Sequence, residues 1–252
     1  AAVPPPRGGP GVLFPPPATV LYVDQSISSS GNGTSWPTAL KTLDEALYIA
    51  HNCPSVTIIN VAAGTYKPTK KPYDAGVEIT TADARDVTFH LRNGVAIYGG
   101  FPNGGGTRDW AANPTILSGD FNDNDVVTGT GSTLSITGNE ENAYHVIVSV
   151  ADDNTTVLDG FTISGGNADG GGTITVESQT IIRNNGGGIF NRNSSPTITN
   201  ITFTGNYADI AGGAMFNISS SSPIITNTTF TRNWGYIGGG ILNQLLSSPS
   251  IT

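Results

Sequence analysis

One acidic turn holds the side chains best suited to bind a cation. Oxygen-bearing side chains gather within this turn, at Asp120, Asn122, Asn124 and Asp125. Oxygen ligands spaced along a loop are what Ca²⁺ prefers, so we consider Ca²⁺ a candidate cofactor. Three more residues can close the site from the next turn of the chain: Glu140, Glu141 and Asn142. Gly131 stands where an EF-hand loop needs its last glutamate, so a solvated acidic turn is the alternative.

Two aromatic residues are candidates for contact with sugars. Tyr207 and Trp234 each follow an asparagine that recurs in the sequence, at Asn206 and Asn233. This shared position predicts that the two rings stack as neighbours on one turn. If the rings are exposed, they form a platform on which a sugar ring can stack. The alternative is an aromatic pair that only stabilises the fold.

The sequence assigns no catalytic residue. Hydrolysis or elimination on a sugar polymer needs neighbouring carboxylates, or a carboxylate-bound Ca²⁺ beside a basic residue. From residue 186 onward the chain offers only a few charged groups: Asp209, Arg192 and Arg232. The histidines are far apart in sequence and are interpreted as ordinary packed or surface residues: His51, His90 and His145. A solvated loop explains a further cluster: Asp83, Arg85, Asp86 and His90.

The elements that would position these residues repeat along the chain. The phrase Gly-Gly-Gly-Ile-Phe-Asn ends at Asn191, and related phrases end at Asn217 and Asn243, each 26 residues further on. A second phrase runs from Ser194 to Asn206 and recurs from Ser221 to Asn233. A fixed period of this size indicates a solenoid built from repeated units.

Each repeat is typical of short strands. Residues 197–199 and 201–204 alternate polar and apolar side chains, and Asn200 between them tolerates the positive φ of a turn. We therefore predict an all-β fold, a right-handed parallel β-helix with three short strands per coil of about 26 residues. Coils would stack ~4.8 Å apart. Like residues would then form ladders, with one asparagine ladder at Asn191, Asn217 and Asn243 and another at Asn200 and Asn227. The pattern leaves open whether Ile189 or Phe190 points inward.

The N-terminal part differs from the repeats. Residues 1–19 form a proline-rich arm, which is either a tether or a contact arm with an apolar plug at residues 12–14. Residues 20–252 form the repeat domain. An α-helix at about 37–50, with a Thr42–Glu45 capping box, is expected to cover its open end. Long excursions fall at residues 67–86 and 102–114, and an added hairpin is expected at 173–182.

Composition narrows the possible partners. The net charge of −8 and the pI of about 4.6 argue against nucleic acid as a partner. No apolar run reaches 18 residues, so no membrane-spanning segment is expected. The absence of an initial methionine suggests a mature secreted protein, and the end within a repeat suggests a piece of a longer one. Cys53, the single cysteine, cannot form an internal disulfide, and Asn193 and Asn217 are candidate glycosylation sites.

Several motifs resemble one group of proteins. They are Tyr22-Val23-Asp24, residues 61–66, residues 97–101, residues 115–120 and residues 158–163, together with the glycine repeats. The chain is similar to secreted bacterial β-helix surface proteins whose repeats resemble those of polymorphic outer membrane proteins. This resemblance implies adhesion, surface display or extracellular polysaccharide work. We therefore expect a structural or adhesive protein that binds a surface glycan or assembles with itself. A polysaccharide lyase or glycoside hydrolase is the alternative.

Overall fold

The computed structural model describes residues 18–252. The predicted contact arm, with its apolar plug at residues 12–14, lies almost wholly outside the described residues. Most of the regular structure is strand, arranged in several parallel sheets without a closed barrel. The chain is therefore an all-β protein with few helices.

Four parallel sheets carry the architecture. Sheet 1 has seven strands: β1 (Val20–Val23), β2 (Ile58–Ala62), β7 (Ala96–Phe101), β12 (Val157–Asp159), β18 (Thr197–Thr199), β22 (Ile224–Thr226) and β26 (Ser250–Ile251). Sheet 2 has five: β3 (Gly64–Tyr66), β8 (Thr115–Ser118), β13 (Thr162–Ser164), β19 (Thr202–Thr204) and β23 (Thr229–Thr231). Sheet 3 also has five: β6 (Phe89–His90), β11 (Ile147–Val150), β17 (Ile189–Arg192), β21 (Met215–Ile218) and β25 (Ile241–Gln244). Sheet 4 has three: β14 (Asn167–Ala168), β20 (Tyr207–Ala211) and β24 (Trp234–Ile237).

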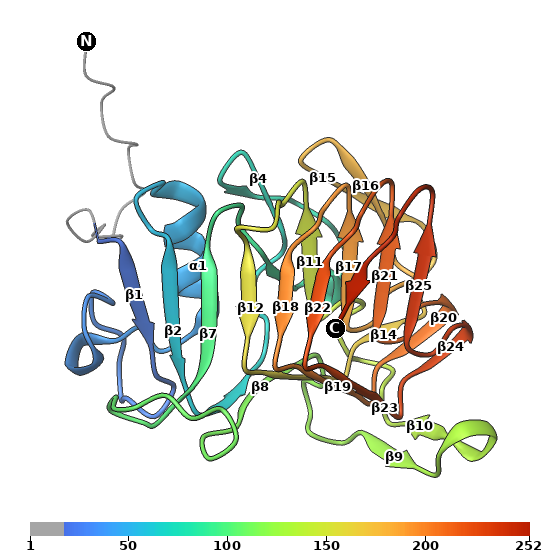
Figure 1. Ribbon diagram of the computed structural model, residues 1–252, viewed down its shortest axis with the longest axis horizontal. Coiled ribbons are helices and arrows are strands. Elements are labelled where there is room, and N and C mark those ends of the chain that lie inside the picture. The colour runs from blue at the N-terminus through green and yellow to red at the C-terminus, as the bar shows by residue number, and fades with distance from the viewer. Residues whose placement is uncertain (1–17) are drawn as a thin grey trace.

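The chain visits these sheets in a repeating circuit. It passes from β18 in sheet 1 to β19 in sheet 2, then through β20 and β21 in sheets 4 and 3, and returns to sheet 1 at β22. Figure 1 shows sheet 1 as a row of arrows from blue at β1 to red at β22, with sheet 3 behind it. Strands of successive circuits therefore lie side by side.

The predicted register of the repeats is confirmed. Asn191 pairs with Asn217, and Asn217 pairs with Asn243. Phe203 lies beside Phe230, with ring centroids 5.0 Å apart and planes 3° from parallel. Equivalent residues meet because each circuit has nearly the same length, so identical side chains fill identical positions.

Sheet 3 is buried on both faces except at its edge strand β25. Ile189 belongs to the main core with Ile147 and Met215, whereas Phe190 belongs to a second apolar cluster on the opposite face. Both side chains are 0% exposed. An inserted hairpin, β15 (Thr173–Val176) and β16 (Gln179–Ile182), covers the second cluster at the residues predicted for it. Ile189 therefore points into the main core. Phe190 points to the outer face of the sheet, where the hairpin buries it.

The helix is shorter and later than predicted. α1 spans Leu43–Asn52 instead of about 37–50, and a separate 3₁₀ turn, η1, occupies Trp36–Thr38. The predicted capping box sets this boundary, since the Thr42 hydroxyl accepts from the backbone N–H of Glu45 and the Glu45 carboxylate accepts from that of Thr42. Among the described residues, no helix is long and apolar enough to cross a membrane.

The long excursions between circuits contain the remaining elements. They are β4 (Tyr73–Asp74), β5 (Val77–Glu78), η2 (Ala84–Asp86), β9 (Val126–Thr128), η3 (Gly131–Thr133) and β10 (Ser135–Thr137). The β9–β10 hairpin protrudes from the stack at the lower right of Figure 1. Excursions of this kind leave the circuits intact, because they replace only the connections between sheets.

A buried carboxyl group gives the stability of the fold a pH dependence. Burial raises the pKa of Asp152 to about 7, although the hydroxyl of Ser149 donates to it over 2.6 Å. Its contribution to stability is complete below the unfolded pKa of about 3.8 and is lost as the pH rises through 7. Asp152→Asn removes this loss and keeps an oxygen for Ser149. In urea unfolding, the free energy of unfolding of the variant relative to that of the parent should therefore rise between pH 4 and pH 8. A relative free energy that does not change with pH would contradict this assignment.

Candidate functional site

The acidic turn is organised by its own backbone. Asp120 is buried, and its Oδ1 accepts from the N–H groups of Asn122 and Asn124 at 3.2 and 3.3 Å. Its Oδ2 accepts from the N–H of Asp125 at 3.2 Å. Hydrogen bonds of this kind satisfy a carboxylate without a metal ion. Asp120 therefore has a structural role in shaping the turn.

The other predicted ligands divide between solvent and protein. The side chains of Asn122 and Asn124 are exposed. The carboxylate of Asp125 accepts twice from the Asn142 amide, at 2.9 and 3.1 Å. Burial, with the nearby negative charge of Asp120, raises the pKa of Asp125 to about 6. No group of three metal-ligating His, Cys, Asp or Glu residues occurs in the part of the chain that the structure describes. The contacts of Asp120 and Asp125 need no metal ion, and the buried Asp120 is not solvated. Binding of Ca²⁺ at this turn stays a prediction.

The two aromatic residues stack as their positions predict. The rings of Tyr207 and Trp234 lie 4.5 Å apart and 5° from parallel, on neighbouring strands β20 and β24. Because each ring covers a face of the other, the facing surfaces are closed to a sugar. The geometry is that of an aromatic ladder, and a sugar-stacking role for this pair stays a prediction.

Two asparagine ladders run through the circuits. In the inner ladder, Asn191 donates to Asn217 at 2.7 Å and Asn217 donates to Asn243 at 2.8 Å. In the outer ladder, Asn227 donates to Asn200 at 2.6 Å, and both residues have the positive φ expected of them. Both ladders were predicted, because like amides one circuit apart can pair with each other.

Burial removes one of the two candidate glycosylation sites. Asn217 is 0% exposed and is hydrogen-bonded on both sides, so a folded chain cannot accept a glycan there. The prediction for Asn217 is therefore wrong. Asn193 is exposed in the turn after β17, where its φ is 49°, and it stays a candidate.

Two histidines come together unexpectedly. His51 at the end of α1 stacks on His90 of β6, with ring centroids 4.7 Å apart. Burial lowers the pKa of His51 to about 4 and holds the pKa of His90 well below its usual value. This contact could not be predicted from the sequence, because the two histidines are far apart in the chain and meet only where α1 packs on sheet 3. Both rings are packed, which is one of the two placements expected for the histidines.

The charged cluster near residue 85 also packs rather than being solvated. Asp86 is buried against Arg183 of the inserted hairpin, and Asp83 accepts from the Tyr144 hydroxyl at 2.7 Å. Arg85 donates to the backbone oxygen of Asn142. These contacts fasten the excursion to the body of the protein. The solvated-loop interpretation is therefore wrong for Asp86 and for His90, which are both buried.

The outer face of sheet 2 presents two columns of side chains. The first column contains mostly threonine: Thr65, Ile116, Thr162, Thr202 and Thr229. The second contains only hydroxyl side chains: Ser118, Ser164, Thr204 and Thr231. The residues between the columns point into the core, where Leu117, Ile163 and Phe203 are buried. Alternation along each strand thus produces a floor rich in hydroxyl groups.

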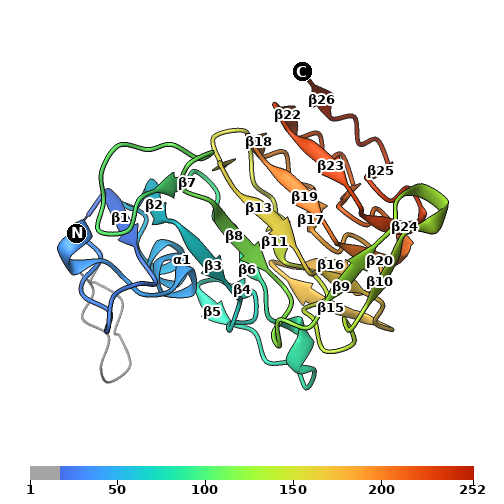
Figure 2. The same cartoon turned by 90° about the horizontal axis from the view of Figure 1, so that it is seen from below.

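Three cavities follow this floor. One of about 510 Å³ lies at Thr65 and Ile116, and one of about 180 Å³ lies at Thr162, Thr202 and Thr229. Pro114 lines both of these cavities. The third, also about 180 Å³, lies on the second column and is bordered by residues of the acidic turn and by Val127 of β9. Figure 2 shows sheet 2 as a diagonal row of strands with the β9–β10 hairpin beside it. We call this surface the sheet-2 groove.

Trp110 forms a wall of the central cavity. Its side chain is 43% exposed, and it lies in the excursion at residues 102–114. The carboxylate of Asp109 accepts from the N–H groups of Ala111 and Ala112 at 3.0 and 3.1 Å and so shapes the turn around the ring. An indole held at the edge of a polar cavity is suited to stacking on a ligand.

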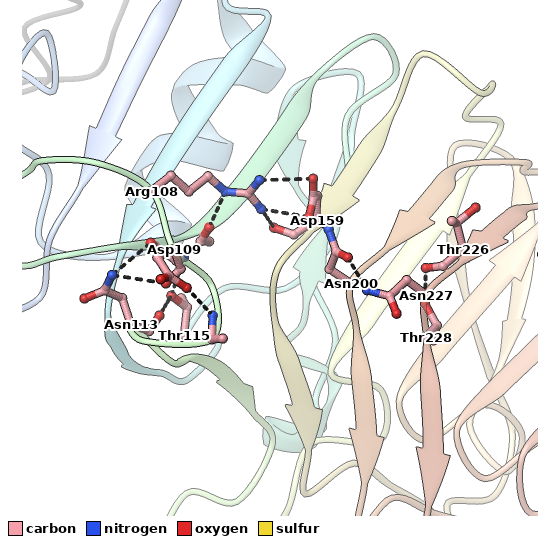
Figure 3. A network of polar contacts seen from close by, with 12 residues as sticks. Arg108, Asp109, Asn113, Thr115, Asp159, Asn200, Thr226, Asn227 and Thr228 are labelled. Atoms are coloured by element: carbon pink, nitrogen blue, oxygen red, sulfur yellow. Dashed lines mark hydrogen bonds and ion pairs between the residues drawn. The ribbon is translucent and has the colours of Figure 1, made fainter.

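A polar network fixes the Trp110 turn to the circuits (Figure 3). Arg108 donates to both carboxylate oxygens of Asp159, at 2.7 and 3.2 Å, and to the backbone oxygen of Gly99 at 2.7 Å. Asp159 also accepts from Asn200, which accepts in turn from Asn227. The outer asparagine ladder therefore ends on the same ion pair that holds the Trp110 turn. This connection orients the wall of the groove relative to its floor.

Comparison with known proteins found no matching family model, no matching curated protein and no matching solved structure. The groove therefore has to be interpreted from its own residues. Sequence reasoning marked the excursion at 102–114 but missed Trp110. A single tryptophan in an otherwise polar connection between strands was the available signal.

Proposed function

We propose that this chain is a right-handed parallel β-helix from an extracellular surface protein, and that it binds glycan in the sheet-2 groove. The repeated circuit through the parallel sheets supports the β-helix, since each circuit returns beside the previous one in register. The resemblance of its motifs to bacterial surface proteins supports an adhesive role outside the cell.

The residues that line the groove are the main support for glycan binding. Sugars present many hydroxyl groups and an apolar ring face, and they bind where hydroxyl and amide side chains surround an aromatic ring. The central cavity combines Thr162, Thr202 and Thr229 with the amides of Asn200 and Asn227 beside Trp110. These residues come from successive circuits, so the surface is elongated and suits a polymer better than a single sugar.

Trp110→Ala tests this function. Loss of a stacking ring should weaken glycan binding about tenfold, equivalent to about 1.4 kcal/mol, with no change in folding. Binding to an array of glycans, followed by titration of the best ligand, measures the effect. Tyr236→Ala is the matched control, because Tyr236 is an aromatic residue that is 78% exposed and does not line the groove. Equal losses in both variants would contradict a specific role for Trp110.

A glycoside hydrolase is the second candidate. Asp120 and Asp125 both line the third cavity. Most glycoside hydrolases use a pair of carboxyl groups to cleave the glycosidic bond. Release of reducing ends from a bound polymer, abolished by Asp125→Asn, would favour this function. Binding without release would favour the adhesive one. Self-association through residues 1–19 remains a prediction that concerns mainly residues outside the described part of the chain.

A further inference from the structure

We infer that the sheet-2 groove selects an uncharged polysaccharide and rejects polymers of uronic acids. This inference rests on the proposed function, because it names the class of glycan that the same groove would take. It is carried by the charges and hydrogen-bonding groups that line the three cavities.

The side chains that line the groove are neutral or acidic among the described residues. Among the described residues that border the three cavities, none is Lys, Arg or His. A polymer with a carboxylate on every sugar needs such groups, because a carboxylate without a partner loses its hydration when it is bound. The floor offers neutral donors and acceptors instead, mainly hydroxyl groups, which match the hydroxyl groups of a neutral sugar.

Two cations near the cavities are already paired. Arg108, beside the central cavity, places its guanidinium on the carboxylate of Asp159. Lys67, near the acidic turn, forms an ion pair with Asp123 at 2.8 Å and also donates to the backbone oxygen of Phe121. Recruiting either group to an anionic ligand would break these contacts. Neither of these two cations is therefore free for a ligand. Arg232, which follows Thr231 in the edge strand of sheet 2, is exposed and borders none of the three cavities.

The third cavity adds negative charge. Asp120 and Asp125 line it, and Glu140 and Glu141 lie close enough to act on Asp125 electrostatically. A uronate polymer following the floor would bring its carboxylates toward these groups. Repulsion at this end would act over roughly 8 Å at physiological ionic strength. An uncharged polymer meets no such penalty and retains the stacking contact with Trp110.

Affinity electrophoresis in gels containing one polymer each tests this inference. The neutral probes are hydroxyethyl cellulose, xyloglucan, galactomannan and unsubstituted xylan, and the anionic probe is polygalacturonate. We expect at least one neutral polymer to bind the protein tenfold or more tightly than polygalacturonate does. Trp110→Ala should weaken the affinity calculated from the retardation about tenfold, whereas Tyr236→Ala should leave that affinity unchanged.

A gain-of-charge variant makes the test independent of loss of folding. Thr202→Lys places a cation on the floor of the central cavity and should improve binding of polygalacturonate. Thr173→Lys adds the same charge on the exposed hairpin strand β15 and should not. Polygalacturonate binding as tight as that of any neutral polymer would overturn the inference and leave glycan binding standing. Failure of every polymer to bind would overturn the proposed function as well.

Discussion

Replacing Arg183 with alanine should destabilise the protein by about 3–5 kcal/mol, because the change leaves a buried carboxylate without its partner. Arg183 Nε and Nη2 donate to the two oxygens of Asp86 at 2.7 Å each. The Asp86 side chain is 1% exposed, so water cannot replace the lost guanidinium. The pair joins the excursion before β6 to the hairpin that covers sheet 3.

Urea unfolding of the single and double variants measures this effect. Arg183→Ala combined with Asp86→Ala removes both charges and should be more stable than Arg183→Ala alone. That ordering is specific to an ion pair, since a role in packing alone would make the double variant worse. A loss below about 1 kcal/mol for the single variant would show that the pair behaves like an exposed one.

The inner asparagine ladder should produce the second large effect. Asn217→Ala should cost about 2–4 kcal/mol, because each buried polar group left without a partner costs about 1–3 kcal/mol. The change removes the acceptor of the Asn191 amide and the donor to Asn243. Asn191 is 0% exposed, so its amide N–H cannot replace the lost bond with one to solvent. Its Oδ1 already has no partner, so the whole amide would be left without a side-chain hydrogen bond.

The same ladder supplies the matched control. Asn243→Ala removes the acceptor of the Asn217 amide, but Asn243 is exposed, so water can take the place of its oxygen. The variant should therefore cost less than about 1 kcal/mol. Comparing the two variants by urea unfolding separates burial from the change of side chain. Equal losses of stability in the two variants would contradict the account. They would mean that a buried amide of the ladder contributes no more to stability than the exposed one.

Repetition explains why so much of the fold could be predicted. Asn191, Asn217 and Asn243 recur at equal spacing because each must match its counterpart one circuit away. The same constraint applied to Phe203 and Phe230, so their pairing followed from the sequence. The Thr42–Glu45 capping box was also predictable, since its signal is local.

The parts that escaped prediction depend on segments that do not repeat. Phe190 is buried only because an inserted hairpin covers it, and His51 meets His90 only because a helix packs on sheet 3. The wall of the groove has the same origin, since Trp110 lies in an excursion that occurs once. Periodicity thus predicts the scaffold, while contacts between excursions determine the candidate site.

Disulfide trapping tests the central claim, that successive circuits lie in register and build the groove floor. With Cys53 replaced by serine, Thr202→Cys is combined with Thr229→Cys, its partner on the neighbouring strand. Neighbouring strands lie about 4.8 Å apart, within reach of a disulfide, whereas Thr231→Cys is displaced by two residues and lies beyond about 7 Å. We predict that mild oxidation of the folded protein closes the Thr202–Thr229 pair and leaves both thiols free in the Thr202–Thr231 pair. Preferential closure of the Thr202–Thr231 pair, or closure of neither, would contradict the account.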